Sequence, residues 1–173
     1  MANLISSVMD QSSKLYLYVN ETKALGIEVL PPDVNKSFAE FSVEEGKIIF
    51  GLSGIKNVGT NLIDSVVKAR KKDGKFINFK DFLQRVDEID SRSLNKKGVE
   101  SLIKAGAFDS LKYTRSSLMA IYEKAISAVS DNRKINVKGQ LNLLDDLADK
   151  PKEDVRIQEI NEFPKKTKLK LEK

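Results

Sequence analysis

The residues with the clearest chemical potential in this sequence lie in a short turn between two predicted helices. The turn spans residues 55–59 (IKNVG), and a helix is predicted from about Thr60 to Arg70. Such turns need small residues or positive φ angles, which glycine meets best and asparagine next. They expose backbone amides beside a helix N-terminus, where a phosphate can bind. The candidate phosphate contacts are therefore Lys56, Asn57, Val58, Gly59 and Thr60.

Cations gather at the far end of the same predicted helix, in the stretch KARKKDGKF. Cations at a helix C-terminus also complement the helix dipole without any ligand, so a solvated helix end is the open alternative. A helix, such a turn and a second helix form a helix-hairpin-helix, and its combination with lysines favours DNA, because amides and lysines recognise phosphates and no base edges. The candidates in this stretch are Lys68, Arg70, Lys71, Lys72 and Lys75.

A second, weaker hairpin is predicted in LNKKGVESLIKAGAFDSLKYTR, with a helix from about Lys96, a turn at residues 105–107 and a helix after Thr114. Phe108 stands where a second glycine is usual, so this turn either touches phosphate or only packs against the first hairpin. Two hairpins about a pseudo-twofold axis could contact both strands of a DNA duplex. The candidates here are Lys96, Lys97, Lys104, Gly106 and Arg115.

The fold expected to hold these residues is mainly α. Residues 1–50 predict a helix over 12–25, an extended path at Pro31 and Pro32, and a β-hairpin turning at Glu45-Gly46. Residues 51–130 predict a tandem helix-hairpin-helix domain, with Asn78 and Asn95 as helix caps and a helix over 115–129 capped by Thr114. Residues 131–173 are polar and predict a flexible linker with short ordered elements.

Composition narrows the possible chemistry. The 173 residues contain no cysteine and no histidine, which excludes disulfides, thiol nucleophiles, histidine bases and cysteine–histidine zinc sites. Residues 68–138 hold 17 basic and 9 acidic residues, whereas residues 1–67 hold 5 and 8, so the positive charge lies in the middle of the chain. No stretch approaches the ~20 apolar residues of a membrane span, so a cytoplasmic protein without a membrane partner is expected.

Four stretches resemble, in order, one family: the alpha subunit of bacterial DNA polymerase III, of the DnaE type. They are LGIEVLPPDVNKSF, IIFGLSGIKNVG, GKFINFKDFLQRVD and LNKKGVESLIKAGAFDSL. The resemblance covers nearly the whole chain and implies an internal fragment, from the end of the fingers through the tandem hairpins. It implies double-stranded DNA and the rest of the polymerase as partners.

The same resemblance implies a nucleotidyltransferase parent that uses magnesium, whose catalytic aspartates lie upstream of this sequence. Asp145 and Asp146 match no catalytic motif, so no catalytic residue, metal ligand or cofactor is assigned to the fragment, which is expected to be inactive alone. GQLNLL resembles the peptide by which polymerase subunits bind the sliding clamp (the beta subunit), although it could also be one packed amphipathic turn. The clamp-binding candidates are Gln140, Leu141, Leu143 and Leu144.

Two other functions remain open from the sequence. Similar hairpins occur in nucleases, ligases and glycosylases, so the chain could be a small DNA-processing enzyme, although no paired carboxylates or histidines support a site. It could also be a protein-interaction scaffold in which the hairpins only pack and the lysines serve solubility.

Overall fold

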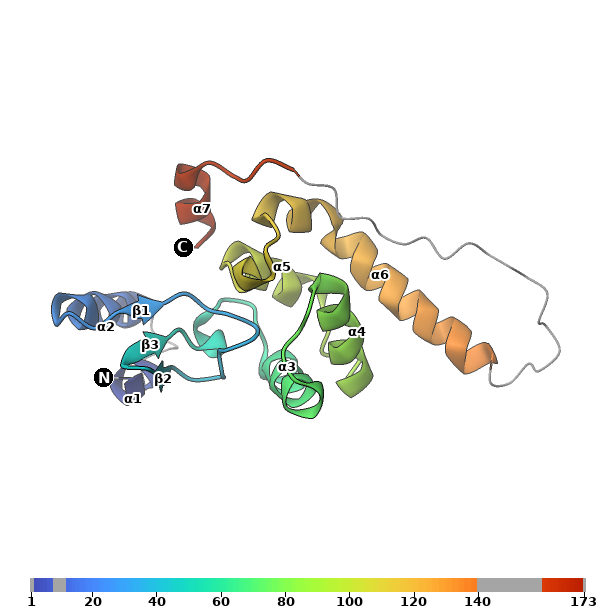
Figure 1. Cartoon of the computed structure of the whole chain (residues 1–173), viewed down its shortest axis with the longest axis horizontal. Helices are drawn as coiled ribbons and strands as arrows, with labels where there is room; N and C mark the ends of the chain where they lie inside the picture. The colour runs from blue at the N-terminus through green and yellow to red at the C-terminus, as the bar shows by residue number, and fades with distance from the viewer. Residues whose placement is uncertain (1, 8–11, 140–159, 173) are drawn as a thin grey trace.

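The computed structural model of the chain describes residues 2–7, 12–139 and 160–172. Helices dominate these residues, and a small three-stranded sheet lies near the N-terminus (Figure 1). The predicted class, mainly α with a small α+β segment in front, is confirmed.

The N-terminal segment packs two helices against the sheet. Ile5 and Leu15 from the helices meet Phe41 and Ile48 from the sheet region in a small apolar core, and the rings of Phe41 and Phe50 lie 4.7 Å apart. The predicted helix over 12–25 is confirmed by α2. The elements are α1 (Ala2–Ser6), α2 (Ser12–Ala24), β1 (Val29–Leu30), β2 (Ser42–Glu44) and β3 (Lys47–Ile49).

The predicted β-hairpin is present and turns where expected. β2 and β3 pair antiparallel, with Glu44 opposite Lys47, and β1 pairs parallel with the other edge of β3. Glu45 and Gly46 both have positive φ (51° and 77°). Two such residues form the kind of turn whose twist matches that of the flanking strands. Residue type at two positions thus sets the register of this hairpin.

The segment after β1 ties the sheet to the helices. Pro31 and Pro32 keep it out of helix, and Val34 then inserts fully into the main core. The Asn35 side chain bonds both backbone groups of Phe76: its amide donates to the carbonyl (3.0 Å) and its oxygen accepts from the N–H (2.7 Å). This extended segment therefore positions the helices that carry the first hairpin.

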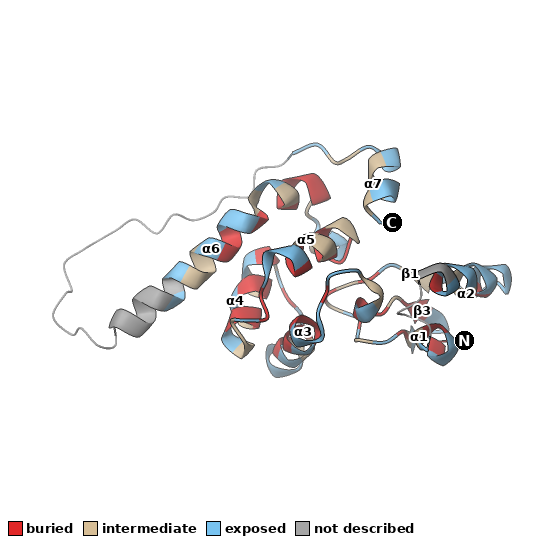
Figure 2. Ribbon diagram, turned by 180° about the vertical axis from the view of Figure 1, so that it is seen from behind, coloured by how far each residue is buried: buried red, intermediate tan, exposed pale blue. Residues whose placement is uncertain are grey.

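The main core lies where α3, α4, α5 and the first half of α6 meet (Figure 2). At its centre the ring of Phe82 lies 5.1 Å from Phe76 and 4.8 Å from Phe108, and Phe79 lies 5.1 Å from Phe108. The two hairpins therefore share one core. Its helical elements are η1 (Leu52–Gly54), α3 (Thr60–Asp73), α4 (Phe79–Ile89), α5 (Lys96–Lys104), η2 (Asp109–Leu111) and α6 (Arg115–Gly139).

The predicted helix caps are confirmed. Asn78 accepts a hydrogen bond from the N–H of Asp81 (2.8 Å), and Asn95 accepts one from the N–H of Gly98 (2.7 Å). Thr114 accepts one from the N–H of Ser117 (3.2 Å) at the start of α6. Each cap satisfies an amide that the helix itself leaves unpaired.

The predicted end of α6 is wrong. The helix continues past Val129 to Gly139, through residues that were expected to be linker. No proline or glycine interrupts this stretch before Gly139, and Arg133 pairs with the buried Asp87 of α4 (3.3 Å), which holds the helix beyond its apolar stripe. Beyond residue 159, α7 (Lys165–Leu171) is one of the short ordered elements that were expected.

Candidate nucleic-acid interface

The first hairpin turn has the backbone that its sequence predicts. Asn57 adopts a left-handed conformation (φ 66°), which confirms the role given to it in place of glycine. Val58 is buried and its N–H bonds the carbonyl of Ile55 (3.2 Å), so the turn is fixed to the core, while Lys56 is exposed beside it. The turn is thus a rigid element that delivers the chain to the start of α3.

The backbone of Gly59 does not have the positive φ that was one expected reason for a glycine at this position. Its backbone is extended (φ −75°, ψ 154°), a conformation open to any residue, so no left-handed strain requires glycine here. A Cβ at this position would meet nothing within 4 Å. Open space therefore lies where a side chain of residue 59 would stand, at the N-cap of α3.

The amides beneath that space are unpaired. Within the described residues, the N–H groups of Gly59, Thr60 and Asn61 make no hydrogen bond, whereas those of Leu62 and Ile63 already bond the carbonyl of Gly59. The first turn of α3 holds no acidic side chain. Three unpaired donors at the positive end of a helix dipole are suited to an anion.

An exposed face of α3 carries lysines from this site toward the C-terminal end of the helix. Thr60, Asp64 and Lys68 follow each other at four-residue spacing on the exposed side, and Lys71 continues the same face. Lys72 is also exposed and lies 4.0 Å from Asp73, at the margin of an ion pair. Lys75 is exposed just after the helix. Asp64 is therefore an acidic group within an otherwise positive face.

Arg70 does not belong to this exposed face. Its guanidinium donates to the carbonyls of Val34 and Ser37 (both 2.9 Å) and lies 4.9 Å from the ring of Phe38. Burial lowers the pKa of Arg70. Its contacts show a residue that joins α3 to the extended segment after β1, so we withdraw it from the candidate phosphate contacts.

The second hairpin is closed by contrast with the first. Phe108, at the position where a glycine is usual, is buried in the aromatic core. Among its predicted contacts, Lys97 and Lys96 are exposed, and Lys96 pairs with Glu123 on the surface (2.8 Å), while the partly buried Lys104 pairs with Glu100 (2.6 Å). Gly106 is buried with φ 82°, as a left-handed turn glycine. This geometry favours the alternative in which the second turn packs.

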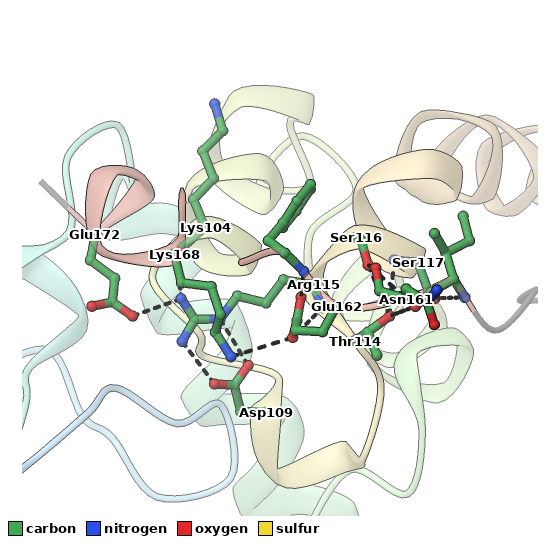
Figure 3. A network of polar contacts seen from close by, with 12 residues as sticks. Lys104, Asp109, Thr114, Arg115, Ser116, Ser117, Asn161, Glu162, Lys168 and Glu172 are labelled. Carbon is green, nitrogen blue, oxygen red and sulfur yellow. Dashed lines mark hydrogen bonds and ion pairs between the residues drawn. The ribbon is translucent and has the colours of Figure 1, made fainter. Parts of the chain in front are cut away.

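Arg115 is the centre of that closed turn (Figure 3). It is 4% exposed and forms ion pairs with Asp109 and Glu172 (both 2.8 Å), and it donates to the carbonyl of Lys104 (3.0 Å). A Cβ on Gly106 would clash with the guanidinium, so the glycine makes room for it.

The ionisation of Arg115 fits this internal role. Burial lowers the pKa of Arg115, but Asp109 and Glu172 outweigh it and raise the value. The guanidinium therefore stays charged with its partners inside the chain. We withdraw Arg115, like Arg70, from the predicted DNA contacts.

The C-terminal strap, which we define as residues 160–172, covers the start of α6 (Figure 3). Ser116 donates to the carbonyl of Asn161 (2.8 Å), and the N–H of Ile160 donates to Ser117 (2.8 Å). Glu162 accepts from the N–H of Arg115 (3.2 Å) and from that of Phe163 (2.8 Å). A carboxylate of the chain itself thus occupies the N-terminal end of α6.

The acidity of Glu162 reflects that position. Burial opposes its charged form, but the two backbone donors and Lys168 (3.4 Å) prevail and lower the pKa of Glu162. Sequence reasoning missed Glu162 and Glu172, because Arg115 and Glu172 lie 57 residues apart and no local pattern links them.

The predicted clamp-binding residues, Gln140, Leu141, Leu143 and Leu144, lie outside the described residues. No helix among the described residues is both long and apolar enough to cross a membrane. The same residues contain no group of three or more acidic side chains placed to hold a metal ion.

Comparisons with known proteins agree with this geometry. A family model described as a helix-hairpin-helix motif matches residues 26–118, more than half of the chain. Curated relatives named DNA polymerase III subunit alpha include those of Mycobacterium leprae, 43% identical over 83% of the chain, and Vibrio cholerae, 35% identical over 100% of it. The relative from Escherichia coli is 34% identical over 88% of the chain.

The chain is much shorter than these relatives. It spans 12% of the Mycobacterium leprae protein, 15% of the Vibrio cholerae protein and 13% of the Escherichia coli protein. The similarity therefore concerns one internal portion of a large polypeptide. The chain belongs to the helix-hairpin-helix family, in a form similar to an internal segment of the DNA polymerase III alpha subunits.

Proposed function

We propose that this chain is the part of a replicative polymerase alpha subunit that holds duplex DNA by its sugar-phosphate backbone. The observation that carries the proposal is the start of α3, where the amides of Gly59, Thr60 and Asn61 are unpaired beneath open space. A phosphate oxygen there would accept charge-assisted hydrogen bonds from rigidly held donors, at the positive end of a helix.

The lysines of α3 would extend this grip. Lys68 and Lys71 lie on the helix face that begins at Thr60, and Lys56, Lys72 and Lys75 flank it, all exposed. Lysine is a compact charge without the planar fork that reads guanine, and the nearby Arg70 is engaged inside the chain. Binding is therefore expected to be independent of sequence and strongly dependent on salt.

The remaining partners follow from the relatives and the sequence motif. The clamp peptide Gln140–Leu144 would begin directly after α6, which ends at Gly139. A tether to a sliding clamp would multiply a weak grip on DNA through effective concentration. The chain would contribute no catalytic residue and no cofactor of its own. Synthesis with magnesium would belong to the rest of the polymerase, in the cytoplasm.

Fluorescence anisotropy of a labelled 20-mer duplex tests the proposal at several salt concentrations. The full chain is expected to bind two unrelated sequences alike, with log K falling linearly as log salt rises. Lys71→Glu/Lys72→Glu is expected to weaken binding and flatten that line. Lys14→Glu/Lys23→Glu on α2 makes the same charge change away from α3 and serves as control. No binding at any salt would favour the scaffold alternative instead.

Asp64→Asn provides a test in the opposite direction. Asp64 is exposed between Thr60 and Lys68 on the proposed DNA-facing side of α3, where its charge repels phosphate. The substitution is expected to tighten binding by about twofold to fivefold, as expected for a change of ~0.4–1 kcal/mol between exposed charges. Glu21→Gln on α2 removes the same charge elsewhere and is the control. Equal affinities for wild type and Asp64→Asn would contradict this orientation of α3.

A further inference from the structure

The second hairpin leaves no room for a phosphate in the arrangement seen here. Glu162 accepts from the first amide of α6, and Asp109 and Glu172 hold the Arg115 guanidinium. In the first hairpin the amides at the equivalent helix start are unpaired. The two hairpins are therefore unequal, and a second DNA contact would have to come from another part of the chain.

The strap that closes the second hairpin also carries a cluster of positive charge in α7. α7 has the sequence KKTKLKL, with four lysines and no acidic residue in seven positions. Lys168 pairs with Glu162 (3.4 Å). The other three lysines are exposed and form no ion pair with any of the residues that the structure describes: Lys165, Lys166 and Lys170.

This charge is unfavourable for the chain alone. Lys166 and Lys170 stand four residues apart on the helix, where like charges repel. Lys165 and Lys166 lie in the first turn of α7, where a cation opposes the helix dipole. Despite this, α7 is fixed to the second hairpin through Glu162 and Glu172. A polyanion beside α7 would relieve both the repulsion and the dipole conflict.

We propose that α7 is a second contact to the DNA backbone. Phosphates would bind Lys165, Lys166 and Lys170 in place of the closed second hairpin. The inference rests on the proposed function, since the polyanion is the duplex already held at α3. The partner is the phosphate backbone because α7 offers only ammonium groups and one exposed leucine, Leu169, too little apolar surface for a protein interface.

The test compares salt dependence in two variants of equal charge. Lys165→Gln/Lys166→Gln/Lys170→Gln removes three positive charges from α7, and Lys14→Gln/Lys23→Gln/Lys124→Gln removes three exposed ones from α2 and α6. If each α7 lysine neutralises one phosphate, the slope of log K against log salt should fall by up to ~2.7 in the first variant. The control slope should stay within error of wild type.

A third variant separates charge from structure. Lys165→Arg/Lys166→Arg/Lys170→Arg keeps the charge and is expected to retain the wild-type slope. Equal slopes for the α7 glutamine variant and its control would overturn the inference, and α7 would then face another polyanion or solvent. If wild type binds no duplex, the proposed function itself fails. If wild type binds through the first hairpin but the α7 variant matches its control, only the α7 contact fails.

Discussion

Phe82→Ala is expected to lower the free energy of unfolding by about 3–5 kcal/mol, the largest stability loss of any substitution considered. Phe82 is completely buried, and its ring contacts those of Phe76 and Phe108 at 5.1 and 4.8 Å. Phe108 belongs to the second hairpin, and α4 packs against α3 of the first. The cavity would therefore loosen both hairpins at once.

Urea denaturation, monitored by circular dichroism, measures this loss in the free energy of unfolding. Phe38→Ala is the matched control, because Phe38 is 46% exposed and contributes mainly its contact with Arg70. That contact is worth about 0.5–1 kcal/mol, so the control should change stability far less. Similar losses for the two variants would mean that the aromatic cluster does not organise the core.

Gly59→Asp is expected to weaken duplex binding by about tenfold to a hundredfold with little loss of stability. Aspartate and asparagine are both favoured helix N-caps, and φ −75° with open space above Gly59 admits either. Aspartate, however, places a negative charge where the phosphate would bind. Two like charges ~4 Å apart repel by ~1 kcal/mol in water and ~4 kcal/mol near a protein surface, which brackets the ~1.4–2.7 kcal/mol of a tenfold to hundredfold loss.

Gly59→Asn is the control for this prediction, since it matches aspartate in shape and capping but carries no charge. Anisotropy should show a much smaller loss for asparagine, and thermal unfolding should show both variants folded. If the two variants bound DNA equally well, the start of α3 would not contact phosphate, whatever the lysines do.

The local features of the fold could be predicted from the sequence because each depends on neighbouring residues. The caps at Asn78 and Asn95 act within three residues, and the turn at Glu45-Gly46 follows from two positions. The left-handed Asn57 is a property of one residue in one turn. These signals need no knowledge of what lies across the core.

Long-range contacts decided the features that could not be predicted. In the sequence, Arg70 and Arg115 look like arginines that could bind DNA. In the structure, carbonyl and carboxylate groups that are distant in the sequence bind both side chains. α6 extends past Val129 partly because Arg133 meets Asp87, 46 residues away. Gly59 was expected at a position that needs a small residue or a positive φ, but its backbone is extended and not left-handed.

The most direct test of the account is an amide nuclear magnetic resonance titration of the full chain with a 20-mer duplex at low salt. The largest shifts are expected at Gly59, Thr60 and Asn61, whose N–H groups are unpaired before DNA binds. The N–H groups of Arg115 and Ser117, already bonded within the chain, should change little. Shifts concentrated at residues 115–117, or absent at residues 59–61, would contradict a phosphate grip by the first hairpin.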